Sequence, residues 1–460
     1  MTEFALPPAF VERMRRLLGE ETDAFLNSYA LPLRRGLRVN TLWCDTDTFL
    51  TMFPHPLDAS PFADDAFYLD TPHKAGADPL HHAGAYYMQE PSASSAVTVL
   101  RPQKGEYILD LCAAPGGKST QIAAALGGTG LLWCNEYIKS RAQILLQNLE
   151  RLGVRNAVVS NADTSPLCKQ LEGCFDAVLA DVPCSGEGMF RKEDVALTQW
   201  SEALVKECAD RGEGILHNAS LAVRDGGRIV YSTCTFAPEE NEVQIAHFLQ
   251  THPDFELLEC NVSFGRPAFS AAQLAAFEDV PRDLPLERCR RIFPADGGEG
   301  HFIALLRKRG DGTRRTHAAP KVKPDDAIRA AKALWEECFR CEPNGQFVRY
   351  GDTVRLVPDD LPTVQKLAVL SAGVPVGTVA KNRLEPHHAL FASADPADCR
   401  RVVDLPLDDG CTLAFLHGEE IAVDGDKGYA LVAIEGVPCG FGKVSGGVLK
   451  NKYPKGLRRL

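Results

Sequence analysis

The sequence predicts an α/β protein: a doubly wound, mostly parallel sheet followed by a smaller, β-rich body. Five short apolar runs, each separated from the next by a segment of helix length, predict the sheet: YILDL, GLLWCN, NAVVS, FDAVLA and GRIVYS. Strands that alternate with helices form parallel sheets with helices on both faces. A tight glycine turn, APGG, follows the first run, at the place where such sheets bind a cofactor.

Size and composition are those of a globular protein with several domains. The 460 residues are enough for roughly two to four domains, and 45% hydrophobic with 24% charged residues is ordinary for soluble protein. No apolar run approaches the roughly eighteen residues of a membrane span. The first residues, MTEFALPPAF, lack the basic and apolar regions of a secretory signal. We therefore expect a cytoplasmic protein without a membrane segment, whose fifteen cysteines are reduced.

Cysteine spacing and net charge argue against a zinc site and against nonspecific binding to nucleic acid. The pair Cys338 and Cys341 has no second pair at the spacing of a zinc site, so we expect no bound metal. A net charge of −11 does not favour nonspecific binding to nucleic acid. Any polynucleotide contact must come from local basic patches, of which three stand out: PLRRGLRVN, LERCRRIFP and KNKYPKGLRRL. Solvated surface charge explains each patch equally well when it is taken alone.

The regions around the sheet are predicted from periodicity and turn residues. A helical opening spans Ala9 to Ala30, and LRVNTLW alternates like a short strand. YIKSRAQILLQNLERLG has the spacing of a helix that ends at Gly153, and FELLEC and HFIALL are candidates to finish the sheet. DGTRRTHAAPKVKPDD is typical of a linker, and a helix from Ala327 to Phe339 opens the second body. The predicted domains are an N-terminal subdomain, a sheet domain, a linker and a C-terminal region, at residues 1–90, 91–310, 311–325 and 326–460.

The glycine turn discriminates among three kinds of cofactor. A dinucleotide site needs G-x-G-x-x-G, and this turn has the adjacent pair Gly116 and Gly117 instead. GGKST imitates the end of a phosphate-binding P-loop, but that motif requires a glycine where this chain has Cys112. The NTPase alternative therefore fails at one required position. S-Adenosylmethionine carries no phosphate, and needs close backbone approach at its amino-acid end and carboxylates for its hydroxyls and adenine.

Carboxylates at the ends of the following runs fit that third cofactor. Glu136 ends the second run, where an acid can accept both ribose hydroxyls. Asp163 follows the third run, where it can accept from the adenine amino group, and Asp181 ends the fourth. One acid at a strand end is weak evidence, because such residues also cap helices. Three of them in register with a glycine turn favour S-adenosylmethionine.

Two cysteines stand at the same edge of the predicted sheet: Cys184 in DVPCSGEG and Cys234 in RIVYSTCTF. Beside a methyl donor, a thiolate that adds to carbon-6 of a cytosine turns carbon-5 into a nucleophile. A carboxyl such as Asp181 would stabilise the charge that develops near N3 and the exocyclic amine. Loss of the carbon-5 proton and elimination of the thiol complete the cycle. This chemistry needs one activated cysteine, and the residues alone do not say which; both could also be core residues.

Several stretches resemble a known family. DLCAAPGGKST, DVPCSGEGMFRK and YSTCTFAPEENE are similar to motifs of the RNA cytosine-5 methyltransferases of the NOL1/NOP2/Sun family. QEPSAS, RRIFPADGGEGHFIALL and GFGKVSGGVLKNKYPKGLR resemble its bacterial branch that acts on small-subunit ribosomal RNA, so the resemblance runs nearly end to end. It implies a Rossmann-like class I methyltransferase sheet, an N-terminal RNA-recognition subdomain and a C-terminal, β-rich PUA-like module that binds RNA.

The resemblance also assigns roles to residues. It makes Cys234 the nucleophile, gives Cys184 the release of methylated RNA, and matches Lys192 to a basic residue near the substrate, although a surface role explains Lys192 equally well. Asp181 completes the catalytic set. The residues that match the family's S-adenosylmethionine site are Cys112, Ala113, Ala114, Pro115, Gly116, Gly117, Lys118, Glu136, Asp163 and Asp181.

The implied activity is carbon-5 methylation of cytosine in small-subunit (16S) rRNA, in the decoding region, through a covalent cysteine–cytosine intermediate. The target base must leave its stack to reach a thiol. The expected partner is rRNA of the small subunit or its precursor, and a monomer is favoured. Two alternatives remain: a tRNA cytosine-5 methyltransferase, which shares these motifs, and a non-catalytic RNA-binding assembly factor. The presence of both cysteines argues against the second.

Overall fold

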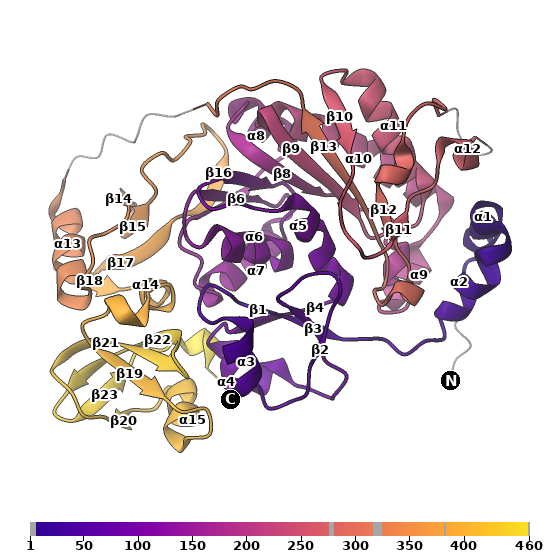
Figure 1. Cartoon of the computed structure of the whole chain (residues 1–460). Coiled ribbons are helices and arrows are strands. Elements are labelled where there is room, and N and C mark those ends of the chain that lie inside the picture. Colours follow the sequence, from indigo (N-terminus) through magenta and orange to yellow (C-terminus); the bar gives the residue numbers. More distant parts are fainter. Residues whose placement is uncertain (1–5, 276–279, 316–323, 381–382, 459–460) are drawn as a thin grey trace.

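The fold is centred on one large sheet (Figure 1). A computed structural model of the chain describes residues 6–275, 280–315, 324–380 and 383–458. The sheet has ten strands in the order β11-β12-β13-β9-β8-β5-β6-β7-β16, and β10 pairs with β13. Its strands are β5 (Tyr107–Asp110), β6 (Leu131–Asn135), β7 (Ala157–Asn161), β8 (Phe175–Asp181), β9 (Val223–Thr233), β10 (Phe255–Leu258), β11 (Arg266–Pro267), β12 (Arg290–Ile292), β13 (His301–Lys308) and β16 (Ala368–Ala372).

The five predicted runs form the parallel core of this sheet, β9-β8-β5-β6-β7. The doubly wound prediction is therefore confirmed, because the first run lies in the middle and later strands add on both sides of it. FELLEC and HFIALL also join, as the antiparallel strands β10 and β13. All five parallel strands end along one side, which we call the carboxyl edge.

Helices cover both faces of the sheet, because successive strand residues point to opposite sides. In β5, Tyr107 and Leu109 pack in a buried cluster with α8, α10 and α11. Ile108 packs in a second cluster with α5, α6 and α7. These helices are α5 (Ser95–Leu100), α6 (Gly117–Leu126), α7 (Lys139–Arg151), α8 (Thr164–Gln170), α10 (Glu202–Ala222) and α11 (Glu242–Thr251). The predicted helix before Gly153 is thus α7.

The N-terminal region carries a small sheet of its own, in the order β2-β3-β1-β4. The helical opening is divided at Gly19, whose φ of +54° ends the first helix. The LRVNTLW prediction corresponds to β1. The elements are α1 (Pro8–Leu18), α2 (Thr22–Ser28), β1 (Gly36–Val39), α3 (Thr46–Met52), β2 (Asp58–Ala59), β3 (Ala66–Tyr68), α4 (Pro79–His82) and β4 (Tyr86–Gln89). Two further short helices, α9 (Asp194–Gln199) and α12 (Ala271–Leu274), follow later in the chain.

The C-terminal region begins with the predicted helix, α13 (Asp326–Cys338), and is otherwise rich in strands. Two small sheets follow, with strand orders β14-β15-β17-β18 and β19-β21-β22-β23-β20. Their strands are β14 (Gln346–Tyr350), β15 (Thr353–Val357), β17 (Val374–Ala380), β18 (Arg383–Pro386), β19 (Val402–Leu405), β20 (Ile421–Ala422), β21 (Gly428–Ile434), β22 (Val437–Ser445) and β23 (Val448–Asn451), with helices α14 (His388–Ala392) and α15 (Gly410–His417) among them. The sequence did not predict that β16, from this region, pairs with β7 of the large sheet.

The predicted linker 311–325 is described in part. Its first residues lie against the large sheet: the Arg314 guanidinium donates to Asp176 at 2.9 Å and lies 3.5 Å from the centroid of the Tyr107 ring. Residues 316–323 lie outside the described residues, so the division into four domains stays a prediction. Within the described chain, no helix is long and apolar enough to cross a membrane. No group of three or more His, Cys, Asp or Glu there could hold a metal ion.

Candidate active site

The two predicted cysteines meet at the carboxyl edge. Strands β8 and β9 are parallel neighbours, with Asp181 opposite Ser232, so the loops that follow them start side by side. The Sγ atoms of Cys184 and Cys234 lie 3.2 Å apart, and the backbone N–H of Cys234 donates to Cys184 Sγ at 3.3 Å. Both side chains are partly buried. The thiols therefore form one pair rather than two separate core positions.

A buried polar network joins the two thiol loops one residue beyond each cysteine. The hydroxyls of Ser185 and Thr235 are hydrogen-bonded at 2.8 Å. Glu240 accepts from the Ser185 backbone N–H at 2.9 Å and from the Ser185 hydroxyl. Burial raises the pKa of Glu240 to about 8, although the bonds from Ser185 lower it. This carboxyl therefore carries a proton at neutral pH. Sequence reasoning missed it, since nothing local distinguishes it from the acids beside it in PEENE.

Asp181 is held as a carboxylate next to the thiols. It accepts from Lys118 Nζ at 2.8 Å and from the Ser232 hydroxyl at 2.7 Å. Burial by itself would raise the pKa of Asp181, but Lys118 and these hydrogen bonds hold it below its ordinary value. Burial opposes the charge of Lys118, yet the charges of Asp181 and Cys234 raise its pKa. The site thus holds an ion pair whose cation also interacts electrostatically with Cys234.

The glycine turn leaves bare backbone between β5 and α6. Gly116 has a φ of +114°, in the left-handed region. A Cβ at Gly117 would lie 3.0 Å from Gln89 Oε1 and 3.2 Å from a ring carbon of Tyr87, so the turn packs closely against β4. The Arg141 guanidinium donates to the carbonyl of Ala114 at 2.9 Å and fixes the turn from the α7 side. The absence of side chains at Gly116 and Gly117 therefore lets the turn pack closely against α7 and β4.

Asp110, the last residue of β5, was not among the predicted site residues. Its Oδ2 accepts from the Ser119 hydroxyl at 2.7 Å, whereas its buried Oδ1 has no hydrogen-bond partner. Burial raises its pKa to about 7. A buried acceptor without a partner, beside a bare turn, suits the ammonium of an amino-acid group. The residues present therefore fit the amino-acid end of S-adenosylmethionine.

The other two predicted carboxylates are held by the chain that follows them. Glu136, directly after β6, accepts from the Ile138 N–H at 2.8 Å and is 4% exposed. Asp163, after β7, is exposed and caps α8, because its Oδ1 accepts from the Ser165 N–H at 2.8 Å. One oxygen of Asp163 therefore caps a helix, as the alternative explanation for acids at strand ends predicted. Cofactor contact by either carboxylate stays a prediction.

Lys192 lies at the surface. Its side chain is exposed. Its neighbour Arg191 forms a buried ion pair with Glu299 at 3.3 Å. A role of Lys192 at the substrate stays a prediction.

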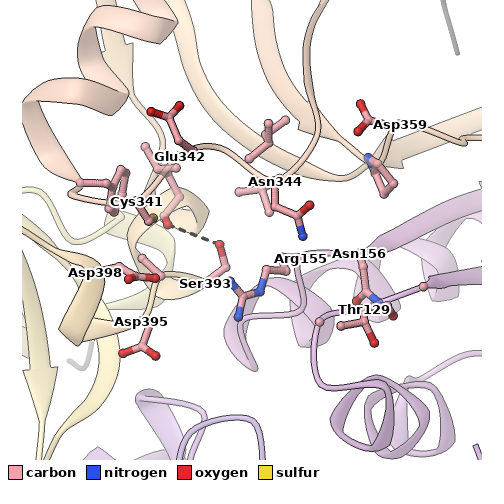
Figure 2. Close-up of a pocket in the computed structure, with 18 of the residues that line it drawn as sticks. Thr129, Arg155, Asn156, Cys341, Glu342, Asn344, Asp359, Ser393, Asp395 and Asp398 are labelled. Carbon is pink, nitrogen blue, oxygen red and sulfur yellow. Dashed lines mark hydrogen bonds between the residues drawn. The ribbon is translucent and has the colours of Figure 1, made fainter. Parts of the chain in front are cut away.

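A separate cavity of about 480 Å³ lies by the opposite ends of the strands, where β5 and β6 begin (Figure 2). Arg155 and Asn156 face Asn344, Asp395 and Asp398 across it. None of the predicted site residues lines this cavity. The chemistry predicted from the sequence therefore belongs to the carboxyl edge.

Matches to known families cover most of the chain. They are "16S rRNA methyltransferase RsmB/F" over residues 97–307, "N-terminal domain of 16S rRNA methyltransferase RsmF" over 6–91, "RsmF rRNA methyltransferase first C-terminal domain" over 333–393 and "Methyltransferase RsmF PUA domain" over 402–459. The chain is 32% identical to the ribosomal RNA small subunit methyltransferase F of Erwinia tasmaniensis, covering 98% of this chain and 97% of that protein. The chain belongs to the ribosomal RNA small subunit methyltransferase F family. A Shewanella loihica member is also 32% identical, over 95% of this chain and 92% of its own.

Solved structures agree with a methyltransferase fold. A methyltransferase homolog from Pyrococcus horikoshii has a TM-score of 0.59 and 28% identity, covering 66% of this chain and 96% of that chain. NSun6 from the same organism, solved with SFG, has a TM-score of 0.54 at 21% identity, covers 66% of this chain and 99% of that one, and shows the shared fold. The predicted Rossmann-like methyltransferase sheet and PUA-like module are confirmed. The match to a methyltransferase family agrees with the predicted cofactor, S-adenosylmethionine.

Proposed function

We propose that this protein methylates carbon-5 of a cytosine in the decoding region of 16S rRNA, through a covalent bond between Cys234 and the base. Membership of the methyltransferase F family supports methyl transfer to 16S rRNA. Attack on carbon-5 of a cytosine through a covalent intermediate is supported by the thiol pair, whose sulfurs lie 3.2 Å apart, and by the Asp181 carboxylate at the same carboxyl edge. Carbon-5 of a cytosine needs such a thiolate, because the aromatic ring is not nucleophilic there.

The environment of the two sulfurs supports their division of labour. The hydrogen bond with Cys234 and burial raise the pKa of Cys184 well above its ordinary value. Cys184 therefore keeps its proton, and the Cys234 sulfur lies 3.2 Å from it. The Lys118 ammonium interacts electrostatically with Cys234. These contacts support Cys234 as the nucleophile and Cys184 as the residue that assists release.

Each step then uses one of these groups. Cys234 Sγ adds to carbon-6, and the electron pair of the broken double bond gives carbon-5 the character of an enamine carbon. N3 takes up a proton from solvent as the thiolate adds, and the Asp181 carboxylate is placed to stabilise the positive charge that N3 and the exocyclic amine share once carbon-5 has taken the methyl group. S-Adenosylmethionine bound at the glycine turn would supply an electrophilic methyl group. Water then takes up the carbon-5 proton, the electron pair of that C–H bond re-forms the double bond to carbon-6, and the S–C bond breaks. Cys234 departs as a thiolate while Cys184 assists release.

Bisulfite sequencing tests this function, because 5-methylcytosine resists conversion and cytosine does not. Ribosomal and transfer RNA would be read from cells with the gene, without it, and complemented with wild type or Cys234→Ala. We expect at least one cytosine of 16S rRNA to be protected with wild type and converted in the other two strains.

Two results would contradict the proposal. If only cytosines of transfer RNA were protected, the substrate would be transfer RNA and not 16S rRNA. Identical 16S rRNA patterns in all strains, with the protein present at equal levels, would remove the cytosine-5 activity altogether.

A further inference from the structure

A cleft of about 590 Å³ is not used by the steps above. Residues 31–35, 69–72, 294–295 and 297–299 line it together with Arg191, and we call it the side cleft. Its wall is continuous with the catalytic loops. A Cβ at Gly188 would lie 2.9 Å from the carbonyl oxygens of both Cys234 and Gly300, the residue after Glu299. The loop that reaches Glu299 in the side cleft therefore packs, at its next residue, against the loops that carry the two thiols.

The side cleft carries positive charge that the protein does not neutralise. Arg35 is exposed, and its guanidinium has no hydrogen bond or ion pair to any described residue. Arg191, by contrast, is fixed: it pairs with Glu299 and donates to the carbonyl of Leu31. In a chain with a net charge of −11, a free cation beside the active site is a specific feature rather than general surface charge.

The side cleft also carries exposed apolar side chains and a stacked guanidinium. Leu31 and Leu33 are 49% and 48% exposed, among the most exposed large apolar side chains. The Arg34 guanidinium lies 3.5 Å from the centroid of the Tyr68 ring and is held there by Asp70 at 2.9 Å. Unpaired bases bind to such combinations of apolar side chains and guanidinium planes.

We propose that the side cleft binds one unpaired nucleotide next to the target cytosine. Arg35 holds its phosphate, and its base lies against Leu31, Leu33 and the Arg34 plane. The inference rests on the proposed function for the RNA substrate and assigns it a subsite. A base that leaves its stack needs its neighbours held apart from it, and this cleft holds one of them.

Fluorescence anisotropy with the full chain and a labelled uridine octamer tests the subsite without any cytosine chemistry. Arg35→Ala should weaken binding roughly tenfold, as expected for one charge-assisted hydrogen bond. It should also reduce the salt slope by about 0.7, the value for one single-strand phosphate contact. Arg35→Lys should keep that slope. The matched control is Arg307→Ala, which removes an exposed arginine at the other end of β13.

The apolar side chains of the side cleft allow a second, independent test. Leu33→Ser should weaken octamer binding without changing the salt slope, because it removes a base contact and no charge. Leu50→Ser is its control, since Leu50 is 42% exposed on α3, away from the cleft. With 16S rRNA as substrate, Arg35→Ala should raise KM and leave kcat unchanged.

Equal affinity and equal salt slope for Arg35→Ala and Arg307→Ala would overturn the proposal. So would an octamer of glutamate that displaces the RNA at lower concentration than unlabelled uridine octamer, since the cleft would then be a peptide site. Failure of the proposed function has a different signature. Octamer binding would still depend on Arg35, while bisulfite sequencing would find no modified cytosine.

Discussion

The carboxyl edge has two halves that are held in different ways. In the thiol half, after β8 and β9, Ser185 bonds with Thr235 and with Glu240, which are fifty and fifty-five residues further along the chain. In the cofactor half, after β6 and β7, Glu136 and Asp163 each accept a backbone N–H only two residues away. A substitution in the thiol half should therefore disturb both reacting loops. One in the cofactor half should stay local.

The largest effect is expected from the two thiols, which should differ in kind. Cys234→Ala should abolish methyl transfer and form no adduct, because carbon-5 is never activated without the thiolate. Cys184→Ala should still attack the base, yet remain attached to its methylated product. A denaturing gel with 16S rRNA would show a slow band, sensitive to ribonuclease, with Cys184→Ala alone.

The double variant is the control for this gel, since it should form no band. A band with Cys234→Ala instead would reverse the two roles. If the cysteines only packed the core, each variant would lose a similar, modest stability and neither would trap RNA.

Glu240 links stability of the thiol half to pH. Its pKa of about 8 in the folded chain is far above its ordinary 4.5. Above pH 4.5 the unfolded chain releases this proton while the folded chain keeps it, so rising pH favours unfolding until about pH 8. The slope is at most about 1.4 kcal/mol per pH unit. Urea unfolding across this range should show that loss in wild type and a flatter profile in Glu240→Gln, which has no proton to release.

Glu207→Gln, a change at an exposed acid on α10, is the matched control and should keep the wild-type slope. Parallel profiles for wild type and Glu240→Gln would mean that Glu240 is ionised in the folded chain.

In the cofactor half, Glu136→Ala and Asp163→Ala should each weaken S-adenosylmethionine binding by about 1.5–3 kcal/mol, the range for a lost hydrogen bond to a charged group. Calorimetry measures this directly. Because the two halves are held separately, neither change should alter the thiol loops, so Cys184→Ala combined with either should still trap RNA at saturating cofactor. Unchanged cofactor affinity in both variants would remove these carboxylates from the site.

The smallest effect separates the two roles of Asp163. Asp163→Asn keeps a side chain that can cap α8, whereas Asp163→Ala removes the cap and should cost about 1 kcal/mol of unfolding free energy. In thermal unfolding without cofactor, the wild type and Asp163→Asn should have similar stability, and Asp163→Ala should be less stable than both. Equal stability of all three would mean that the bond to Ser165 contributes nothing.

Sequence reasoning worked where the signal is local. The glycine turn, the apolar runs and the cysteine that follows each of two runs are patterns within about ten residues, and the structure brings those cysteines together. The bond between Ser185 and Glu240 joins residues from two different loops, so neither stretch alone indicates it. Asp110 is a different case. It ends the first run as Asp181 ends the fourth, but a carboxyl becomes significant there because it is buried with an oxygen left without a partner.

The pairing of β16 with β7 has a consequence for how the chain is made. Ala368 lies opposite Asn161, so the outer edge of β7 meets its partner only after about two hundred further residues have been synthesised. Until then a nascent chain can hold every residue of the glycine turn and both thiols, and still present an open strand edge, which is a template for aggregation. The last strand to reach the large sheet comes from the C-terminal region. The large sheet is therefore complete only after that region has been translated. A chain released earlier by the ribosome would expose the unpaired edge of β7.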